Sequence, residues 1–177
     1  MGQNLLTAGN GLLLGALIIA AVTDIRSHKI PNWLTFSMAI LGVGLNGISG
    51  GTSGLVNALV GLLTGMALLI VFYAFGGMGA GDVKLMGAVG SFIGPKMVLW
   101  TAFYTAMIGG IYAVGVMLFH PYYRTTRQAI VQTLKDFIFF RKIYYNEPVK
   151  GPDAPKLCYG VAIAAGTVAA VILKSGT

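Results

Sequence analysis

The stretch that decides the fold class is residues 55–75, LVNALVGLLTGMALLIVFYAF, in which no side chain carries a charge. A transmembrane helix needs about 20 consecutive apolar residues to cross the hydrocarbon core of a bilayer, and this run is long enough. The rest of the chain has the same character, because 56% of its 177 residues are hydrophobic and 10% are charged. A soluble domain carries about 25% charged residues, so the sequence predicts a membrane protein.

Four other long apolar runs and one short run surround this stretch. The long runs cover residues 5–23, 33–49, 97–119 and 157–173. The short run, residues 83–94, is bounded by glycine-rich segments, and we expect it either to cross as a short helix or to re-enter the membrane shielded by its neighbours. The sequence therefore predicts an all-α polytopic membrane protein with about six transmembrane helices, the fourth of them short.

The basic residues orient this predicted bundle. The chain carries 12 Lys and Arg against 5 Asp and Glu, and these charges lie between apolar runs rather than on one amphipathic face, which argues against a nucleic-acid partner. If all six runs cross, only Lys96 and Lys174 fall outside the three connections on one side. The positive-inside rule makes that side cytoplasmic. We therefore expect a multi-pass protein of the cytoplasmic (inner) membrane with both termini outside.

The connection at residues 120–156 is the one long polar stretch of the sequence. Apolar residues recur in it at helical spacing: Ile130, Leu134, Phe137 and Ile138. Basic residues occupy its other faces, which predicts a basic amphipathic helix on the anionic inner leaflet. An ordinary solvated connector is the alternative.

Two of the five acidic residues stand at the junctions of apolar runs, where ionised groups are costly and usually functional. Asp24 ends the first run, and Asp82 opens the short fourth run. Because two crossings separate them, both are expected near the cytoplasmic face. They face each other if the first and fourth helices are neighbours.

Two facing carboxyl groups near hydrocarbon should not both ionise, because like-charge repulsion and desolvation each oppose it. A pair that shares one proton can take a proton from water and give one to a peptide leaving group. The alternative is two separate interfacial aspartates, with Asp82 capping its helix and Asp24 pairing with Arg26 or Lys29.

The segment before Asp82 favours access by a peptide. Residues 76–82, GGMGAGD, are poor in Cβ atoms, so an extended chain can approach the carboxylate closely. Lys84 follows two residues later. It is placed either to tune the carboxylate electrostatically or to anchor the helix by extending its ammonium group to the inner leaflet.

Three segments, in order over nearly the whole chain, resemble the type IV prepilin peptidases, which are intramembrane aspartic proteases. GAGD at residues 79–82 fits the GxGD motif of such proteases, and its extension VKLM is similar to this family. DIRSHKIPN at residues 24–32 is similar to the first catalytic segment, an aspartate followed by Ile-Pro-Asn. YGVAIAAG at residues 159–166 is similar to the final-helix motif Tyr-Gly-x-Ala-Ile, although Cys158 stands where a proline is common.

The resemblance implies a single membrane-embedded peptidase domain over residues 1–177. It implies an endopeptidase that removes the basic leader from prepilins or pseudopilins at the cytoplasmic face, as in type IV pilus and protein secretion systems. Asp24 and Asp82 would be the catalytic pair, and no metal or organic cofactor is implied. The residues implied in the motifs and in substrate access are Gly79, Gly81, Lys84, Pro31 and Asn32.

The resemblance also bears on a second activity. Larger members N-methylate the new terminus with an added cytoplasmic domain that carries paired Cys-x-x-Cys motifs. This sequence has neither that insertion nor more than one cysteine, so methyltransferase activity is not expected. Its size is similar to the small peptidase-only members associated with tight-adherence pili or related secretion systems; archaeal preflagellin peptidases are another possible branch.

Three other functions remain open from the residues. Asp24 and His28, with His120, would offer ligands to a metal hydrolase. A metal site needs more ligands at one point than this sequence pattern brings together. Ser27 beside His28 would suit a serine hydrolase, but no G-x-S-x-G elbow occurs. A non-enzymatic membrane carrier, or a pilus or secretion assembly subunit, would use Asp24 and Asp82 to bind a cation or a proton. The glycine-rich approach to Asp82 favours the peptidase.

Overall fold

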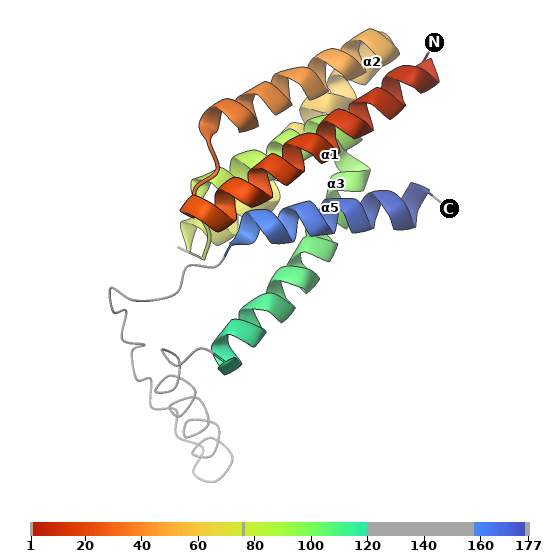
Figure 1. Cartoon of the computed structure of the whole chain (residues 1–177). Coiled ribbons are helices and arrows are strands. Elements are labelled where there is room, and N and C mark those ends of the chain that lie inside the picture. Colours follow the sequence, from red (N-terminus) through yellow and green to blue (C-terminus); the bar gives the residue numbers. More distant parts are fainter. Residues whose placement is uncertain (1, 76, 120–157, 176–177) are drawn as a thin grey trace. The chain divides into compact units, whose positions relative to one another are not determined.

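A computed structural model describes residues 2–75, 77–119 and 158–175 of the chain. Every regular element in these ranges is an α-helix (Figure 1). The elements are α1 (Gly2–Ser27), α2 (Asn32–Ala74), α3 (Ala80–Phe119) and α5 (Tyr159–Ser175). The predicted all-α class is confirmed for this part of the chain. The predicted surface helix within residues 120–156 lies outside the described residues.

Two of the helices are each broken at one glycine. Gly51 in α2 has φ 60° and ψ −142°, and Gly94 in α3 has φ 77° and ψ 174°. Glycine adopts a positive φ without the penalty that a Cβ atom brings, and Pro95 after Gly94 lacks the N–H that a continuous helix would use. Gly51 falls between two of the apolar runs expected from the sequence, and Gly94 is the last residue of the short run. The predicted runs therefore fall on helices of the described residues, whereas the six membrane crossings stay a prediction.

The two halves of α2 both pack on the first half of α3. Before the break, the Asn46 amide donates hydrogen bonds to the carbonyl oxygens of Ser91 (3.0 Å) and Phe92 (3.2 Å). After the break, Gly61 approaches so closely that a Cβ atom on it would overlap the carbonyl oxygen of Gly90. Small residues permit such approach of helix backbones in membranes. The segment that begins with Asp82 is thus held from two sides.

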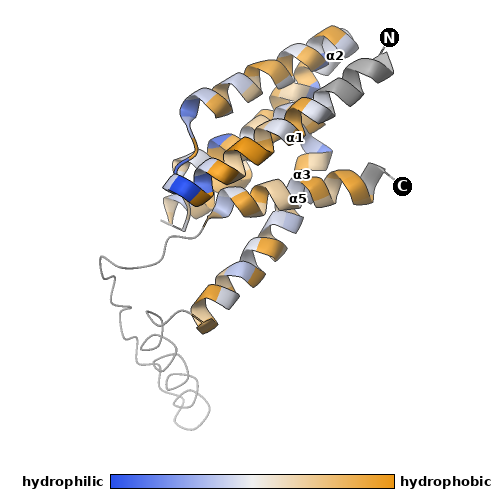
Figure 2. Cartoon of the chain, in the orientation of Figure 1, coloured by the Kyte–Doolittle hydropathy of each residue, from blue (hydrophilic) through white to orange (hydrophobic). Residues whose placement is uncertain are grey.

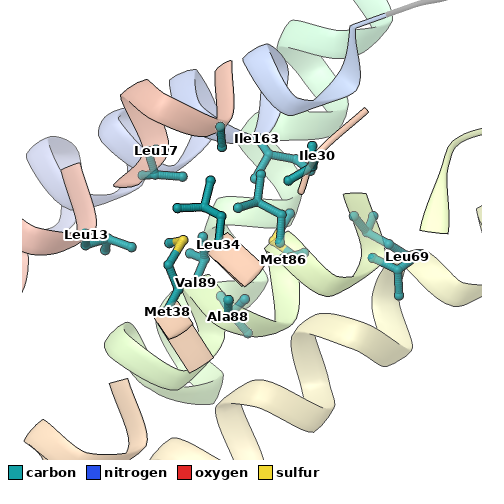
Figure 3. Packing of buried hydrophobic residues seen from close by; sticks show 14 residues of the cluster. Leu13, Leu17, Ile30, Leu34, Met38, Leu69, Met86, Ala88, Val89 and Ile163 are labelled. Atoms are coloured by element: carbon teal, nitrogen blue, oxygen red, sulfur yellow. The ribbon is translucent and has the colours of Figure 1, made fainter. Parts of the chain in front are cut away.

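The core between the helices is apolar and contains side chains from α1, α2, α3 and α5 (Figure 3). Its packing lies within one compact unit of the chain, formed by Met1–Gly109 and Leu157–Thr177. Labelled members of the core are Leu13 and Leu17 of α1, Leu34 and Met38 of α2, Met86 and Val89 of α3, and Ile163 of α5. Ile30, in the turn between α1 and α2, joins the same core and links it to the acidic residues described below.

Much of the outer surface is also apolar. Large hydrophobic side chains such as Ile40 (71% exposed) and Leu63 (64% exposed) point away from the core, and hydrophobic residues predominate along the helices (Figure 2). By length and composition, α2 and α3 each qualify as helices that can cross a membrane. Exposed apolar surface of this extent is unfavourable in water and is typical of a surface that contacts another apolar phase.

Candidate active site

Asp24 lies in the last turn of α1 and is 5% exposed. The helix ends just beyond it because His28 adopts a left-handed conformation with φ 49°. The backbone N–H of His28 donates a hydrogen bond to the carbonyl oxygen of Asp24 (2.8 Å). This is the αL type of helix C-cap, so the chain leaves α1 four residues after Asp24.

The Asp24 carboxylate is held by the beginning of α5. Its Oδ2 atom accepts a hydrogen bond from the backbone N–H of Gly160 (2.8 Å). Gly160 is also a site of close approach, because a Cβ atom there would lie 2.9 Å from Asp24 Oδ2. The basic neighbours Arg26 and Lys29 are exposed. The buried environment of the carboxylate is therefore set by a helix distant in the sequence.

Asp82 lies in the first turn of α3 and is 7% exposed. Its Oδ2 atom accepts a hydrogen bond from the backbone N–H of Gly79 (3.0 Å), and its own N–H donates to the carbonyl oxygen of Gly79 (3.1 Å). The side chain thus accepts a hydrogen bond from the residue that precedes the helix, as the side chain at position N3 does in a capping box. The capping role considered for Asp82 is present, and the carboxylate is buried as well.

The turn after α1 helps to join the segments of Asp24 and Asp82, because Ile30 packs on the glycine-rich segment before Asp82. A Cβ atom on Gly81 would lie 3.2 Å from Ile30 Cβ. The turn that follows α1 therefore contacts the glycine-rich segment that precedes Asp82, whereas the facing of Asp24 and Asp82 stays a prediction.

Lys84 and Asn32 connect the start of α3 to the start of α2. Lys84 Nζ donates a hydrogen bond to Asn32 Oδ1 (2.9 Å) and lies 5.6 Å from the centroid of the Phe36 ring. Pro31 precedes α2 in an extended conformation, with φ −63° and ψ 134°. The Lys84 ammonium group thus ties the start of α3 to the start of α2, a contact that the sequence analysis did not anticipate.

The structure also shows the surroundings of residues that a serine hydrolase or a metal hydrolase would use. Ser27 Oγ donates hydrogen bonds to the carbonyl oxygens of Thr23 (2.7 Å) and Lys29 (3.2 Å), so its hydroxyl is engaged by backbone acceptors. Within residues 2–75, 77–119 and 158–175, no group of three or more His, Cys, Asp and Glu side chains has an arrangement that could hold a metal ion. His120 lies outside the described residues.

Sequence reasoning missed the residues that hold Asp24. Besides Gly160, Cys158 Sγ lies 3.3 Å from His28 Nδ1 and 3.8 Å from the backbone oxygen of Asp24. The available signal was the Tyr-Gly pair at the start of the final apolar run. That pair marks a motif, but it does not say which distant residue the glycine faces.

The sequence model of the type IV leader peptidase family matches residues 11–114, a range that contains both aspartates and ends before α5. The chain is similar to the prepilin leader peptidase/N-methyltransferase of Bacillus subtilis (33% identical over 110 residues; 60% of this chain, 44% of the relative). It is also similar to the proteins of the same name from Pectobacterium carotovorum (33% over 102 residues; 51% and 36%) and Neisseria gonorrhoeae (29% over 120 residues; 64% and 42%).

The chain spans less than half the length of these curated relatives. No solved structure gives a significant match. The family match nevertheless covers more than half of the chain and includes Asp24 and Asp82. The chain therefore belongs to the type IV leader peptidase family.

Proposed function

We propose that this chain is a membrane aspartic endopeptidase that removes the basic leader peptide from prepilins or pseudopilins. The observation that carries the proposal is the pair of buried carboxyl groups, Asp24 and Asp82, whose segments are connected through the contact between Ile30 and Gly81. Membership of the family and the names of the similar proteins support the substrate class.

The proposed chemistry uses the two carboxyl groups in different protonation states. The ionised group takes a proton from a water molecule, whose oxygen then adds to the carbonyl carbon of the scissile peptide bond. The protonated group donates to the carbonyl oxygen, and when the C–N bond breaks a proton passes to the departing amine. In both residues the Oδ2 atom accepts a glycine N–H, so we assign the water and the substrate to the Oδ1 atoms.

The membrane arrangement belongs to the same proposal. We place the pair near the cytoplasmic face of the inner membrane, with six crossings and both termini outside. The six helical segments and the apolar outer surface support this placement. A prepilin would enter from the membrane, its basic leader attracted by the ionised carboxylate, while the basic connection at residues 120–156 contacts anionic lipid phosphates.

We further propose that the chain cleaves without N-methylating the product. The sequence contains one cysteine, Cys158, and so lacks the paired Cys-x-x-Cys motifs. The mass of the new N-terminus tests this directly, because one methyl group adds a fixed mass to the mature pilin.

The experiment is co-expression with a candidate prepilin, with leader removal read by gel mobility and by mass spectrometry of the new N-terminus. Wild type is compared with Asp24→Asn and Asp82→Asn, which keep side-chain size and remove the acid. Asp153→Asn is the matched control, because this residue belongs to the polar connection. We expect unmethylated product from wild type and control, and none from the other two variants.

Two results would count against the proposal. Cleavage by either Asn variant would reject the paired mechanism. Failure of wild type to cleave any of several prepilins, despite stable membrane insertion, would favour a carrier or assembly subunit in which Asp24 and Asp82 bind a cation or a proton.

A further inference from the structure

We infer that the start of α5 positions Asp24 for catalysis and that Gly160 is the positioning residue; this inference rests on the proposed function. The two carboxylates are held in different ways. Asp82 is oriented by Gly79, three residues away in its own segment. Asp24 is oriented by Gly160, which is 136 residues away in the sequence. The geometry of Asp24 therefore depends on the contact between α1 and α5.

The first element of this contact is the hydrogen bond itself. Gly160 is the second residue of α5, and the first N–H groups of a helix have no acceptor within the helix. Asp24 Oδ2 supplies that acceptor at 2.8 Å in a buried setting. A hydrogen bond to a carboxylate is stronger than one between neutral groups, and the N-terminal end of a helix favours negative charge. The bond fixes one oxygen of Asp24 and leaves the other for substrate or water.

The second element is the space at Gly160. A Cβ atom built there would lie 2.9 Å from Oδ2, 3.1 Å from Cβ and 3.2 Å from Cγ of Asp24. These atoms belong to the short side chain of Asp24, which the hydrogen bond holds in place. They cannot move away from a Cβ atom on Gly160 while that hydrogen bond is kept. Any residue other than glycine must therefore move Asp24 or separate α5 from α1.

The third element holds the main chain of Asp24. Cys158 Sγ lies 3.8 Å from the Asp24 carbonyl oxygen and 3.3 Å from His28 Nδ1, and His28 is the residue whose left-handed conformation ends α1. Gly160 at the beginning of α5 thus contacts the carboxylate of Asp24, and Cys158, the residue before α5, contacts the turn that follows Asp24.

The first test is a kinetic comparison of Gly160→Ala with wild type on a prepilin substrate, normalised to folded protein. Loss of a hydrogen bond to a charged group predicts a decrease in kcat of about 10- to 100-fold, with KM unchanged within about twofold. One limb of the pH dependence of kcat should also move, which a simple loss of folded protein would not cause.

Gly166→Ala is the matched control on the same helix. A Cβ atom there would meet Thr105, at 2.7 Å from its backbone nitrogen, so this variant also disturbs the packing of α5 but does so away from Asp24. We expect it to lower thermal stability while leaving the normalised kcat and the pH profile unchanged. A Gly160→Ala enzyme that behaves like Gly166→Ala would overturn the inference.

A second measurement needs no substrate and so separates this inference from the proposed function. The change in Tm caused by Gly160→Ala is measured in the wild type and in an Asp24→Ala background, which removes Oδ2 and Cγ. If Asp24 is the neighbour that resists the new methyl group, the loss of Tm should fall by at least half in that background. Equal losses in both backgrounds would contradict the positioning contact, whereas absence of prepilin cleavage by the wild type would contradict the proposed function.

Discussion

The close contact between α2 and α3 gives a quantitative prediction for Gly61→Ala. A Cβ atom on Gly61 would overlap the carbonyl oxygen of Gly90 and lie 2.9 Å from the Cα atom of Gly94. Favourable carbon–carbon contacts need about 3.5–4.0 Å, and the atoms in the way are backbone atoms. The two helices must therefore move apart by roughly 1 Å, which disturbs the segment that carries Asp82.

The size of the effect follows from two opposing contributions. Overpacking of a close-packed core costs about 1–3 kcal/mol, and occasionally more, whereas alanine is favoured over glycine in a helix by about 1 kcal/mol. At Gly44, in the same helix, a Cβ atom would meet nothing within 4 Å, so only the favourable contribution applies. The helix preference applies to both variants and cancels in their comparison, so we expect Gly61→Ala to be less stable than Gly44→Ala by about 1–3 kcal/mol.

Thermal denaturation of the purified detergent-solubilised variants measures this difference. For a chain of this length, the expected separation in Tm is on the order of 5 °C, with Gly44→Ala at or above wild type. Equal Tm values for the two variants would refute the close approach of the α2 and α3 backbones. Such a result would also remove the support that this contact gives to Asp82.

Three further predictions concern the residues around the pair. Lys84→Met should lower stability by about 1 kcal/mol, and a double-mutant cycle with Asn32→Ala should show that the two losses are not additive; additive losses would contradict the hydrogen bond. His28→Val should be less stable than His28→Asn by about 1–2 kcal/mol, because asparagine tolerates the left-handed region and a β-branched residue does not; equal Tm values would argue against the αL cap. Prepilin cleavage should persist after dialysis against a chelator, whereas its loss and recovery with added metal would contradict the proposed aspartic mechanism.

The helical arrangement could be predicted well because it depends on local composition. Apolar runs must be helical in a bilayer, and the breaks at Gly51 and Gly94 occur where glycine and proline interrupt those runs. The prediction of where α1 ends was less accurate. The predicted run ends at Thr23, but the helix continues to Ser27, because backbone hydrogen bonding does not stop where charge first appears. Asp24 is consequently inside the helix.

The burial of Asp24 and Asp82 at helix ends was foreseeable because both stand where apolar runs are interrupted, whereas their facing each other stays a prediction. The hydrogen-bond partners of the two carboxylates were not equally predictable. The bond from Gly79 to Asp82 is local and follows capping rules, whereas the bond from Gly160 to Asp24 depends on how α5 packs against α1. No spacing within one segment encodes that packing. The same reason explains why the contact of Lys84 with Asn32 was not foreseen.

The most direct test of the central claim is a single-turnover cleavage assay with purified protein in lipid nanodiscs. It compares wild type, Asp24→Asn, Asp82→Asn and the double variant at saturating prepilin. Catalytic groups that act as a unit are strongly non-additive, so each single variant should be as inactive as the double variant, while all four remain folded. Cleavage above background by either single variant would contradict a mechanism in which Asp24 and Asp82 act together.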